Sequence, residues 1–175
     1  MDLDAALADI ARFLEHERIS FALVGALAVH AYGHSRATND LDLLVVRDAQ
    51  DRLVPFLESE GFETLHRSEG YSNHLHPDPS RGRVDVVYVD RETWDKIGSA
   101  SRQVRLATRE LRVPKPEHLV AMKVHAMRND PTRTFRDMAD IQYLMTLPGV
   151  DREEIRGYFA DAELLERFRE LERSI

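Results

Sequence analysis

The sequence predicts an α/β (α+β) fold, in which a short mixed sheet flanked by helices is followed by a C-terminal helical bundle. Short apolar runs typical of buried strands alternate with amphipathic helical stripes in the N-terminal two thirds of the chain. After residues 114–116, which read Pro-Lys-Pro, the pattern is helical. We therefore expect an α/β domain over residues 1–114 and a helical part over residues 115–175 that packs on it.

The first elements follow from simple patterns. Leucine and isoleucine recur at helical spacing over residues 3–14, which predicts an amphipathic helix. The apolar run 19–24 predicts a short strand, and the small apolar residues 26–32 predict a buried helix. The near-continuous apolar run 41–46 is typical of a central strand that is buried on both faces.

The middle of the chain continues the alternation. Residues 49–60 carry a second amphipathic stripe, which Gly61 closes as a C-cap. Strands are expected over residues 62–66, 71–76 and 83–89.

The remainder divides into an unclear segment and a helical one. Residues 91–112 show no clear period, although a short edge strand is expected over residues 110–113. From residue 116 onward, apolar stripes predict a series of helices.

Composition excludes several classes of function. The 175 residues contain no cysteine, which rules out disulfides, zinc fingers, iron–sulfur clusters and thiol catalysis. Lys and Arg number 24 and Asp and Glu 31, so the net charge of −7 argues against a strongly basic nucleic-acid binder but leaves room for a local basic site. No apolar run reaches the roughly 18 residues that a membrane span needs. We expect a cytoplasmic protein that does not bind membranes.

Two acids form the most informative feature. Asp40 and Asp42 are one residue apart in the predicted strand, so their side chains project to the same face. Neighbouring carboxylates repel each other and are costly to bury unless a cation compensates them. Magnesium is the usual cation in such sites, where one or two carboxylates and substrate phosphates bind it. Asp85 would supply a third carboxylate if its strand lies beside the first.

A possible phosphate site precedes these acids. Gly25 stands where a strand ends and a helix begins, and a glycine there lets backbone N–H groups approach an anion. Arg36 and Thr38 lie just before the acids and would add donors to the same phosphates.

Segment 24–45, VGALAVHAYGHSRATNDLDLLV, resembles the signature of the DNA polymerase β-like nucleotidyltransferase superfamily. That signature is a glycine-glycine or glycine-serine pair, a spacer, and two acids one residue apart. Segment 119–144, LVAMKVHAMRNDPTRTFRDMADIQYL, is similar to the helical segment of the AbiEii-type minimal nucleotidyltransferases, the type IV toxin family. In that segment a lysine is followed by an arginine, a basic-acidic pair and another acid. The matching residues are Lys123, Arg128, Arg136, Asp137 and Asp140.

The resemblance implies a magnesium-dependent transfer of a nucleoside monophosphate from an NTP. It implies one or two Mg²⁺ ions, bound by Asp40 and Asp42, with Asp85 as a third acid. Lys123 would contact the triphosphate. The corresponding catalytic set is Asp40, Asp42, Asp85 and Lys123, and the NTP-binding set is Gly25, Ala26, Arg36, Thr38, Arg128, Arg136 and Asp137.

The sequence departs from the family pattern at two positions. Ala26 replaces the second glycine or serine of the pair, so no hydroxyl is offered to a phosphate there. Arg136 stands where a lysine is more usual. These differences concern the substrate more than the fold.

Structural interpretations stand beside the functional ones. Lys123 falls on the apolar side of its helix, where it must find an anion, and a salt bridge to Asp137 or Asp140 would provide one. The helical arginines could form a solvated face. His74 and His76 alternate along a strand, but we interpret them as surface residues rather than as a zinc site.

We therefore expect an enzyme whose acceptor is a tRNA or a protein, as in a toxin–antitoxin system with a partner toxin or antitoxin. Two alternatives stay open. One is a non-catalytic antitoxin or binding module with the same fold. The other is a transferase that acts on a small, aminoglycoside-like molecule.

Overall fold

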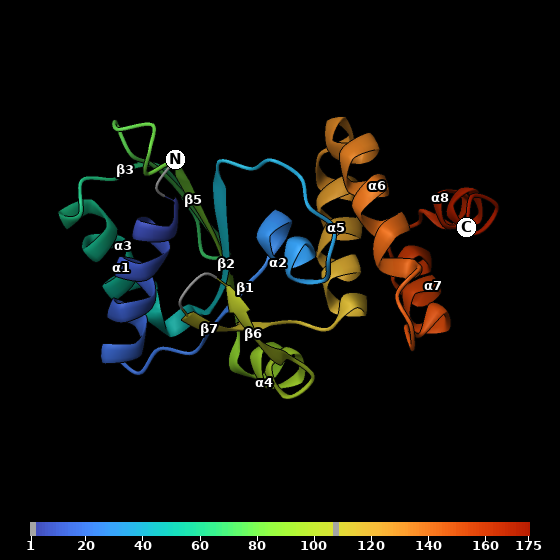
Figure 1. The fold of residues 1–175 in the computed structure, drawn as a ribbon, viewed down its shortest axis with the longest axis horizontal. Helices are drawn as coiled ribbons and strands as arrows, with labels where there is room; N and C mark the ends of the chain where they lie inside the picture. Colours follow the sequence, from blue (N-terminus) through green and yellow to red (C-terminus); the bar gives the residue numbers. More distant parts are fainter. Residues whose placement is uncertain (1–2, 107–108) are drawn as a thin grey trace. The chain divides into compact units, whose positions relative to one another are not determined.

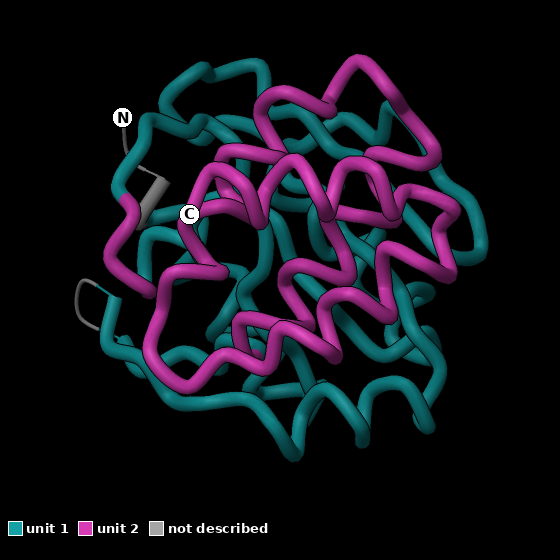
Figure 2. Tube along the Cα trace, turned by 90° about the vertical axis from the view of Figure 1, so that its right-hand side faces the viewer, with its two compact units in different colours: residues 1–31, 35–114 teal, residues 32–34, 115–175 magenta. Residues whose placement is uncertain are grey.

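A computed structural model describes residues 3–106 and 109–175 (Figure 1). The chain forms two compact units (Figure 2). The first comprises Met1–Ala31 and Ser35–Pro114, and the second comprises Tyr32–His34 and Lys115–Ile175. The second unit thus takes three residues from within the N-terminal part of the sequence, which no sequence pattern indicates.

The first unit is a mixed α/β structure. Its strands are β1 Phe21–Leu23, β2 Asp40–Val46, β3 Glu63–Arg67, β4 Tyr71–Leu75, β5 Arg83–Val89, β6 Arg102–Leu106 and β7 Arg109–Val113. Its helices are α1 Leu3–His16, α2 Gly25–Ala31, the 3₁₀ turn η1 Arg47–Ala49, α3 Gln50–Ser59 and α4 Arg91–Ser99.

Five strands form one sheet in the order β1-β2-β5-β4-β3. Strands β2 and β5 run parallel, whereas the other neighbouring pairs are antiparallel. The predicted fold class, a short mixed sheet with flanking helices, is therefore confirmed. Strands β6 and β7 pair antiparallel in a separate two-stranded sheet, so the unclear segment 91–112 contains helix α4 and most of two paired strands.

The first strand is shorter than the apolar run 19–24. Arg18 has a positive φ of 55°, and the Ile19 N–H donates to the Leu14 carbonyl at 2.8 Å. This bond ends α1 and uses the backbone group that a longer strand would need. Strand pairing therefore begins at Phe21, which lies opposite Val45.

The central strand separates two environments. Leu41, Leu43 and Val45 are fully buried, as expected for one face of a covered sheet. Asp40 and Asp42 alternate with them and project from the other face. Figure 1 shows α1 and α3 on one side of the sheet and α2 on the other. The acids share the side on which α2 lies.

The second unit is helical. Its elements are α5 Pro116–Asn129, the 3₁₀ turn η2 Pro131–Arg133, α6 Thr134–Met145, α7 Arg152–Asp161 and α8 Leu165–Glu172. Helix α5 packs against both α6 and α7. Polar contacts fix its start: Lys115 donates to Glu154 at 2.5 Å, and buried Glu117 accepts from the Asp151 N–H at 2.8 Å.

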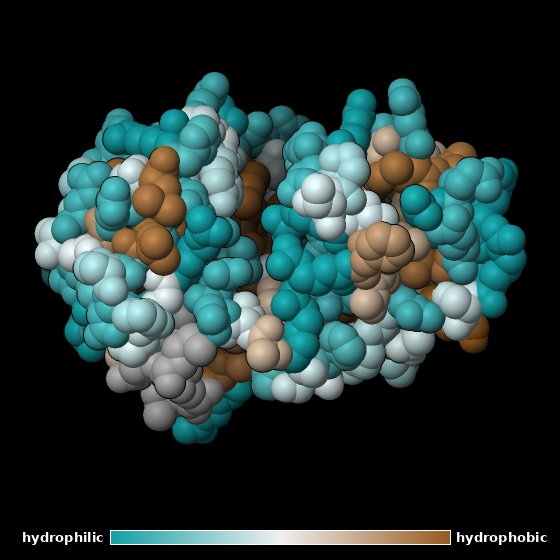
Figure 3. Space-filling view, turned by 90° about the horizontal axis from the view of Figure 1, so that it is seen from above, coloured by the Kyte–Doolittle hydropathy of each residue, from teal (hydrophilic) through white to brown (hydrophobic). Residues whose placement is uncertain are grey.

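Hydrophilic residues predominate on the face drawn in Figure 3, where hydrophobic ones form small patches. Exposed large apolar side chains include Phe135, whose exposed fraction is 92%, with Leu65, Leu75, Val87 and Ile175. Within the described ranges, no helix is both long and apolar enough to span a membrane.

Candidate active site

Three aspartates form a row on one face of the sheet in the first unit. Asp42 of β2 lies directly opposite Asp85 of β5, and Asp40 lies opposite Arg83. Residues opposite each other in parallel strands project to the same face, as do residues two apart in one strand. All three carboxylates therefore share a face, and each residue is half-buried.

Gly25 sits against this row. Its φ is +63°, a conformation that only glycine adopts readily. A Cβ at this position would overlap the Asp42 carboxylate and would lie 2.6 Å from the Asp42 Cβ. The Val24 N–H also donates to the Asp42 carbonyl at 3.0 Å. The backbone at the start of α2 is thus in direct contact with one of the acids.

Strand β4 extends the polar row beyond Asp85. Asn73 lies opposite Asp85 and donates a hydrogen bond to its carboxylate. Burial raises the pKa of Asp85, and the Asp40 charge adds to the effect, while hydrogen bonds from Asn73 and Tyr71 oppose it. Burial and the Asp85 charge likewise raise the pKa of Tyr71 to about 12. Arg83 contributes a cation whose Nε is 3.9 Å from an Asp85 oxygen.

The donor set suits a hard divalent cation that is completed by a substrate. Asp40 and Asp42 present carboxylate oxygens, which Mg²⁺ prefers, and Mg²⁺ commonly takes its other ligands from water and phosphate. Across residues 3–106 and 109–175, no three Asp, Glu or His side chains are grouped so that they could hold a metal by themselves. Asp85 accepts a hydrogen bond from Asn73, and its predicted role as a third metal ligand stays a prediction.

The remaining predicted residues of this unit are Ala26, Arg36 and Thr38. Ala26 is buried in the first turn of α2, and Arg36 is half-buried. The Thr38 hydroxyl accepts from the Asp40 N–H at 3.2 Å. Thr38 therefore orients the backbone at the start of β2.

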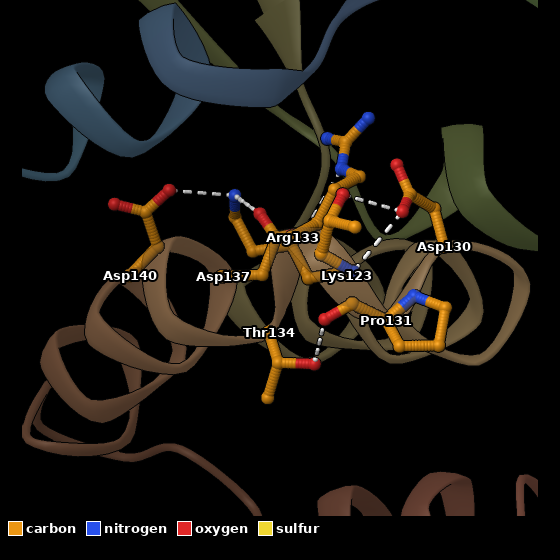
Figure 4. Close-up of polar contacts among 8 residues, drawn as sticks. Lys123, Asp130, Pro131, Arg133, Thr134, Asp137 and Asp140 are labelled. Atoms are coloured by element: carbon orange, nitrogen blue, oxygen red, sulfur yellow. Dashed lines mark hydrogen bonds and ion pairs between the residues drawn. The ribbon is translucent and has the colours of Figure 1, made fainter.

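The second unit contains a different charge cluster (Figure 4). Lys123 Nζ donates to Asp140 at 2.6 Å and to Asp137 at 3.2 Å. Both aspartates are fully buried, and the Lys123 side chain is 8% exposed. The Arg133 Nε binds the other oxygen of Asp137 at 3.2 Å. The structural interpretation of Lys123, a salt bridge to Asp137 or Asp140, describes this contact. The predicted contacts of Lys123 and Asp137 with a nucleotide stay predictions.

The other two predicted arginines of this unit are exposed. Arg128 donates to the Asp161 carbonyl at 3.5 Å and lines a shallow pocket with His125 and Tyr158. Arg136 lies in the first turn of α6, near Asp130.

The structure therefore divides the predicted residues into two groups. Those numbered below 115 belong to the first unit, and Lys123, Arg128, Arg136 and Asp137 belong to the second unit.

Sequence reasoning missed the role of Asn73 and misplaced His74. Asn73 was visible as a polar residue within a predicted strand, but its position opposite Asp85 depends on the pairing of β4 with β5. His74 is fully buried and contacts the Ser72 hydroxyl at 2.8 Å and the Thr64 hydroxyl at 3.1 Å. The surface interpretation of His74 was wrong, because its ring lies inside the first unit and is hydrogen-bonded at both nitrogens.

Solved structures with a similar fold include several nucleotidyltransferases. The antibiotic-resistance factor ANT(2'')-Ia is 16% identical, with coverage of 99% of this chain and 94% of that chain and a TM-score of 0.60. The lincosamide antibiotic adenylyltransferase LnuA, bound to lincomycin, is 15% identical, with coverage of 81% and 96% and a TM-score of 0.59. An antigenic nucleotidyltransferase-like protein from Paracoccidioides brasiliensis is 16% identical, with coverage of 96% and 92% and a TM-score of 0.57. These likenesses concern the fold.

A comparison with curated protein sequences finds no match. The profile of the family described as "Nucleotidyl transferase AbiEii toxin, Type IV TA system" matches residues 6–174, which is nearly the whole chain. The chain therefore belongs to the AbiEii family of nucleotidyltransferases, which are NTP-dependent transferases.

Proposed function

We propose that the carboxylate row of the first unit is the active site of a magnesium-dependent transfer of a nucleoside monophosphate. The observation that carries the proposal is the pairing of β2 with β5, which sets Asp42 opposite Asp85 on the face that also bears Asp40. The contact between Gly25 and Asp42 supports it, because it brings backbone close to the same acids.

The reaction joins an acceptor oxygen to the α-phosphorus of the NTP. The bond from that phosphorus to the oxygen that bridges to the β-phosphorus breaks, and pyrophosphate leaves. Asp40 and Asp42 would hold the cation, which when bound orients the triphosphate and stabilises the negative charge that develops on it. Asp85 takes the proton of the acceptor hydroxyl, and its raised pKa favours that role.

The residues around Asp85 fix its orientation for this step. The Asn73 amide donates to the Asp85 carboxylate and also, at 3.4 Å, to the Tyr71 hydroxyl. A carboxylate held by a positioned donor presents its remaining lone pairs in a fixed direction.

We propose a macromolecular acceptor, a tRNA or a partner protein, in keeping with the type IV toxin–antitoxin description of the family. A small-molecule acceptor is the second candidate. It is favoured by the likeness to ANT(2'')-Ia and LnuA, two proteins whose names connect them to antibiotics.

The test is a transfer assay with each labelled NTP, Mg²⁺, and tRNA, a candidate partner protein or an aminoglycoside as acceptor. We expect label to move to one acceptor class, to require Mg²⁺, and to fall about a thousandfold in Asp42→Asn. Glu69→Gln, which changes an exposed carboxylate that pairs with Arg47, is the matched control and should retain activity. Wild-type transfer by Asp42→Asn would overturn the site, and no transfer with any NTP would overturn the activity.

A further inference from the structure

The segment that joins α2 to β2 passes through the second unit. Tyr32–His34 pack within that unit, while α2 before them and Ser35 after them belong to the first. This segment covalently connects the helix that starts at Gly25 with the strand that starts at Asp40. The two ends of the proposed site are thus linked through three residues that the helical unit holds.

One side chain of α6, Tyr143, contacts this segment at more than one residue. The Tyr143 hydroxyl donates to the Tyr32 carbonyl at 2.8 Å. The His34 ring stacks on the Tyr143 ring, with 4.6 Å between centroids and 22° between planes. His34 Nε2 also lies 3.9 Å from an oxygen of Asp140, one turn earlier on the same helix.

Gly33 allows this close approach. Its φ is +104°, and a Cβ there would lie 2.7 Å from the Tyr143 hydroxyl oxygen. The next nearest atom, Tyr143 Cζ, is 3.9 Å away, an ordinary van der Waals distance. The segment is therefore fitted to the phenol oxygen itself, and not merely to an aromatic ring at that position.

The part of α6 that bears Tyr143 is itself firmly held. Asp140 is fully buried and accepts from Lys123 at 2.6 Å. Separating a buried carboxylate from its cation costs free energy. This ion pair therefore ties α6 to α5 one turn before Tyr143. The tyrosine thus projects from a rigid base.

We infer that Tyr143 is a positioning residue for the nucleotidyl transfer. It holds Tyr32–His34 so that the chain enters β2 with Asp40 and Asp42 in their working orientation. The inference rests on the proposed function, because it assigns Tyr143 an effect on that site. The anchoring of the segment can be measured without any turnover.

The first experiment compares Tyr143→Phe with Tyr158→Phe. Tyr158 is the matched control because its hydroxyl also makes one hydrogen bond in the second unit, to Glu154 at 2.6 Å, but does not touch the segment. We expect Tyr143→Phe to speed hydrogen–deuterium exchange of amides 32–38 about tenfold, and Tyr158→Phe to leave them unchanged. In the transfer assay, Tyr143→Phe should lower kcat about tenfold and leave the KM for NTP within about twofold.

The second experiment uses Gly33→Ala, with Gly149→Ala as its control. Gly149 has a φ of +78°, but a Cβ there would meet nothing within 4 Å, so its substitution reports backbone strain alone. Gly33→Ala should slow transfer and loosen the segment more than Gly149→Ala does. In the Tyr143→Phe background, which removes the oxygen at 2.7 Å, the added effect of Gly33→Ala should shrink to strain alone.

Each outcome supports or overturns the inference. Unchanged exchange of amides 32–38 in Tyr143→Phe would overturn the anchoring, whatever the activity. Faster exchange with wild-type kcat would overturn the positioning role. Fully additive effects of Gly33→Ala and Tyr143→Phe on amide exchange and on transfer would overturn it as well. If the wild type transfers no nucleotide, the proposed function fails, whereas the exchange data and the measured coupling still decide whether Tyr143 holds the segment.

Discussion

The acidic clusters of the two units differ in how deeply their carboxylates are buried. In the second unit, Asp137 and Asp140 are fully buried and are matched by Lys123 and Arg133. In the first unit, Asp40, Asp42 and Asp85 share one sheet face and are half-buried, and the Arg83 Nε lies 3.9 Å from an Asp85 oxygen.

The difference indicates what each cluster does. Removing one partner of a buried ion pair is strongly destabilising, because it leaves an uncompensated buried charge. Acids that repel each other at a partly open surface cost free energy, and such an arrangement is typical of a site that binds a cation. Residue type alone does not distinguish the two clusters, but their burial does.

The largest expected effect concerns the stability of the second unit. Lys123→Met leaves two buried carboxylates without their shared cation, so we expect the free energy of unfolding to fall by about 3–5 kcal/mol in denaturant titration. The double variant Lys123→Met/Asp140→Asn removes one of those charges and should recover part of the loss. Wild-type stability of Lys123→Met would show that this cluster is not structural.

Gly25→Ala tests the contact between Gly25 and Asp42 in the first unit. The new Cβ would overlap the Asp42 carboxylate, and a left-handed φ adds strain of about 1 kcal/mol or more. We expect transfer to fall by two orders of magnitude or so, since the misplaced group is an acid of the site. Gly149→Ala carries the strain without the overlap, and it should lower stability only slightly. Equal activity of the two variants would contradict the contact.

Acidification should destabilise the first unit, because His74 is buried there among hydroxyl groups. Burial lowers the pKa of His74 below its ordinary value of 6.5. The unfolded chain therefore binds a proton more readily than the folded one as the pH falls below 6.5. The stability associated with His74 is complete above 6.5 and is lost as the pH falls towards the folded-state pKa.

His74→Gln isolates this effect, because glutamine does not titrate. We expect the free energy of unfolding of the wild type to fall by about 1 kcal/mol more than that of His74→Gln between pH 7 and pH 5. Thermal melts across that range measure the difference. Parallel curves for the two proteins would mean that His74 does not stay neutral in the folded state.

The smallest expected effect is that of Asp40→Asn on stability. Removing one of three mutually repelling carboxylates should change the free energy of unfolding by less than about 1 kcal/mol, in the direction of greater stability. The same variant should lose transfer activity. A loss of stability as large as that of Lys123→Met would remove the distinction between the two clusters.

The sequence predicts the fold class and the strand positions of the three acids, because both depend on local patterns. Alternation in residues 40–46 and 83–89 places Asp40, Asp42 and Asp85 in strands, and the structure makes those strands neighbours. What sequence reasoning could not find depends on pairing over long distances. Asn73 meets Asp85 only because β4 joins the sheet beside β5. Likewise, the contacts of Tyr143 join residues more than 100 positions apart.

The excursion of Tyr32–His34 into the helical unit also bears on how such a protein can be divided or recombined. A single break after residue 114 would separate these three residues from the helix on which they pack. Neither unit is one continuous stretch of sequence, so a gene crossover at that point would exchange incomplete parts. We expect the two units to be inherited together. In each case, the spacer between Gly25 and Asp40 should match the helix on which it packs, which is α6 in this protein.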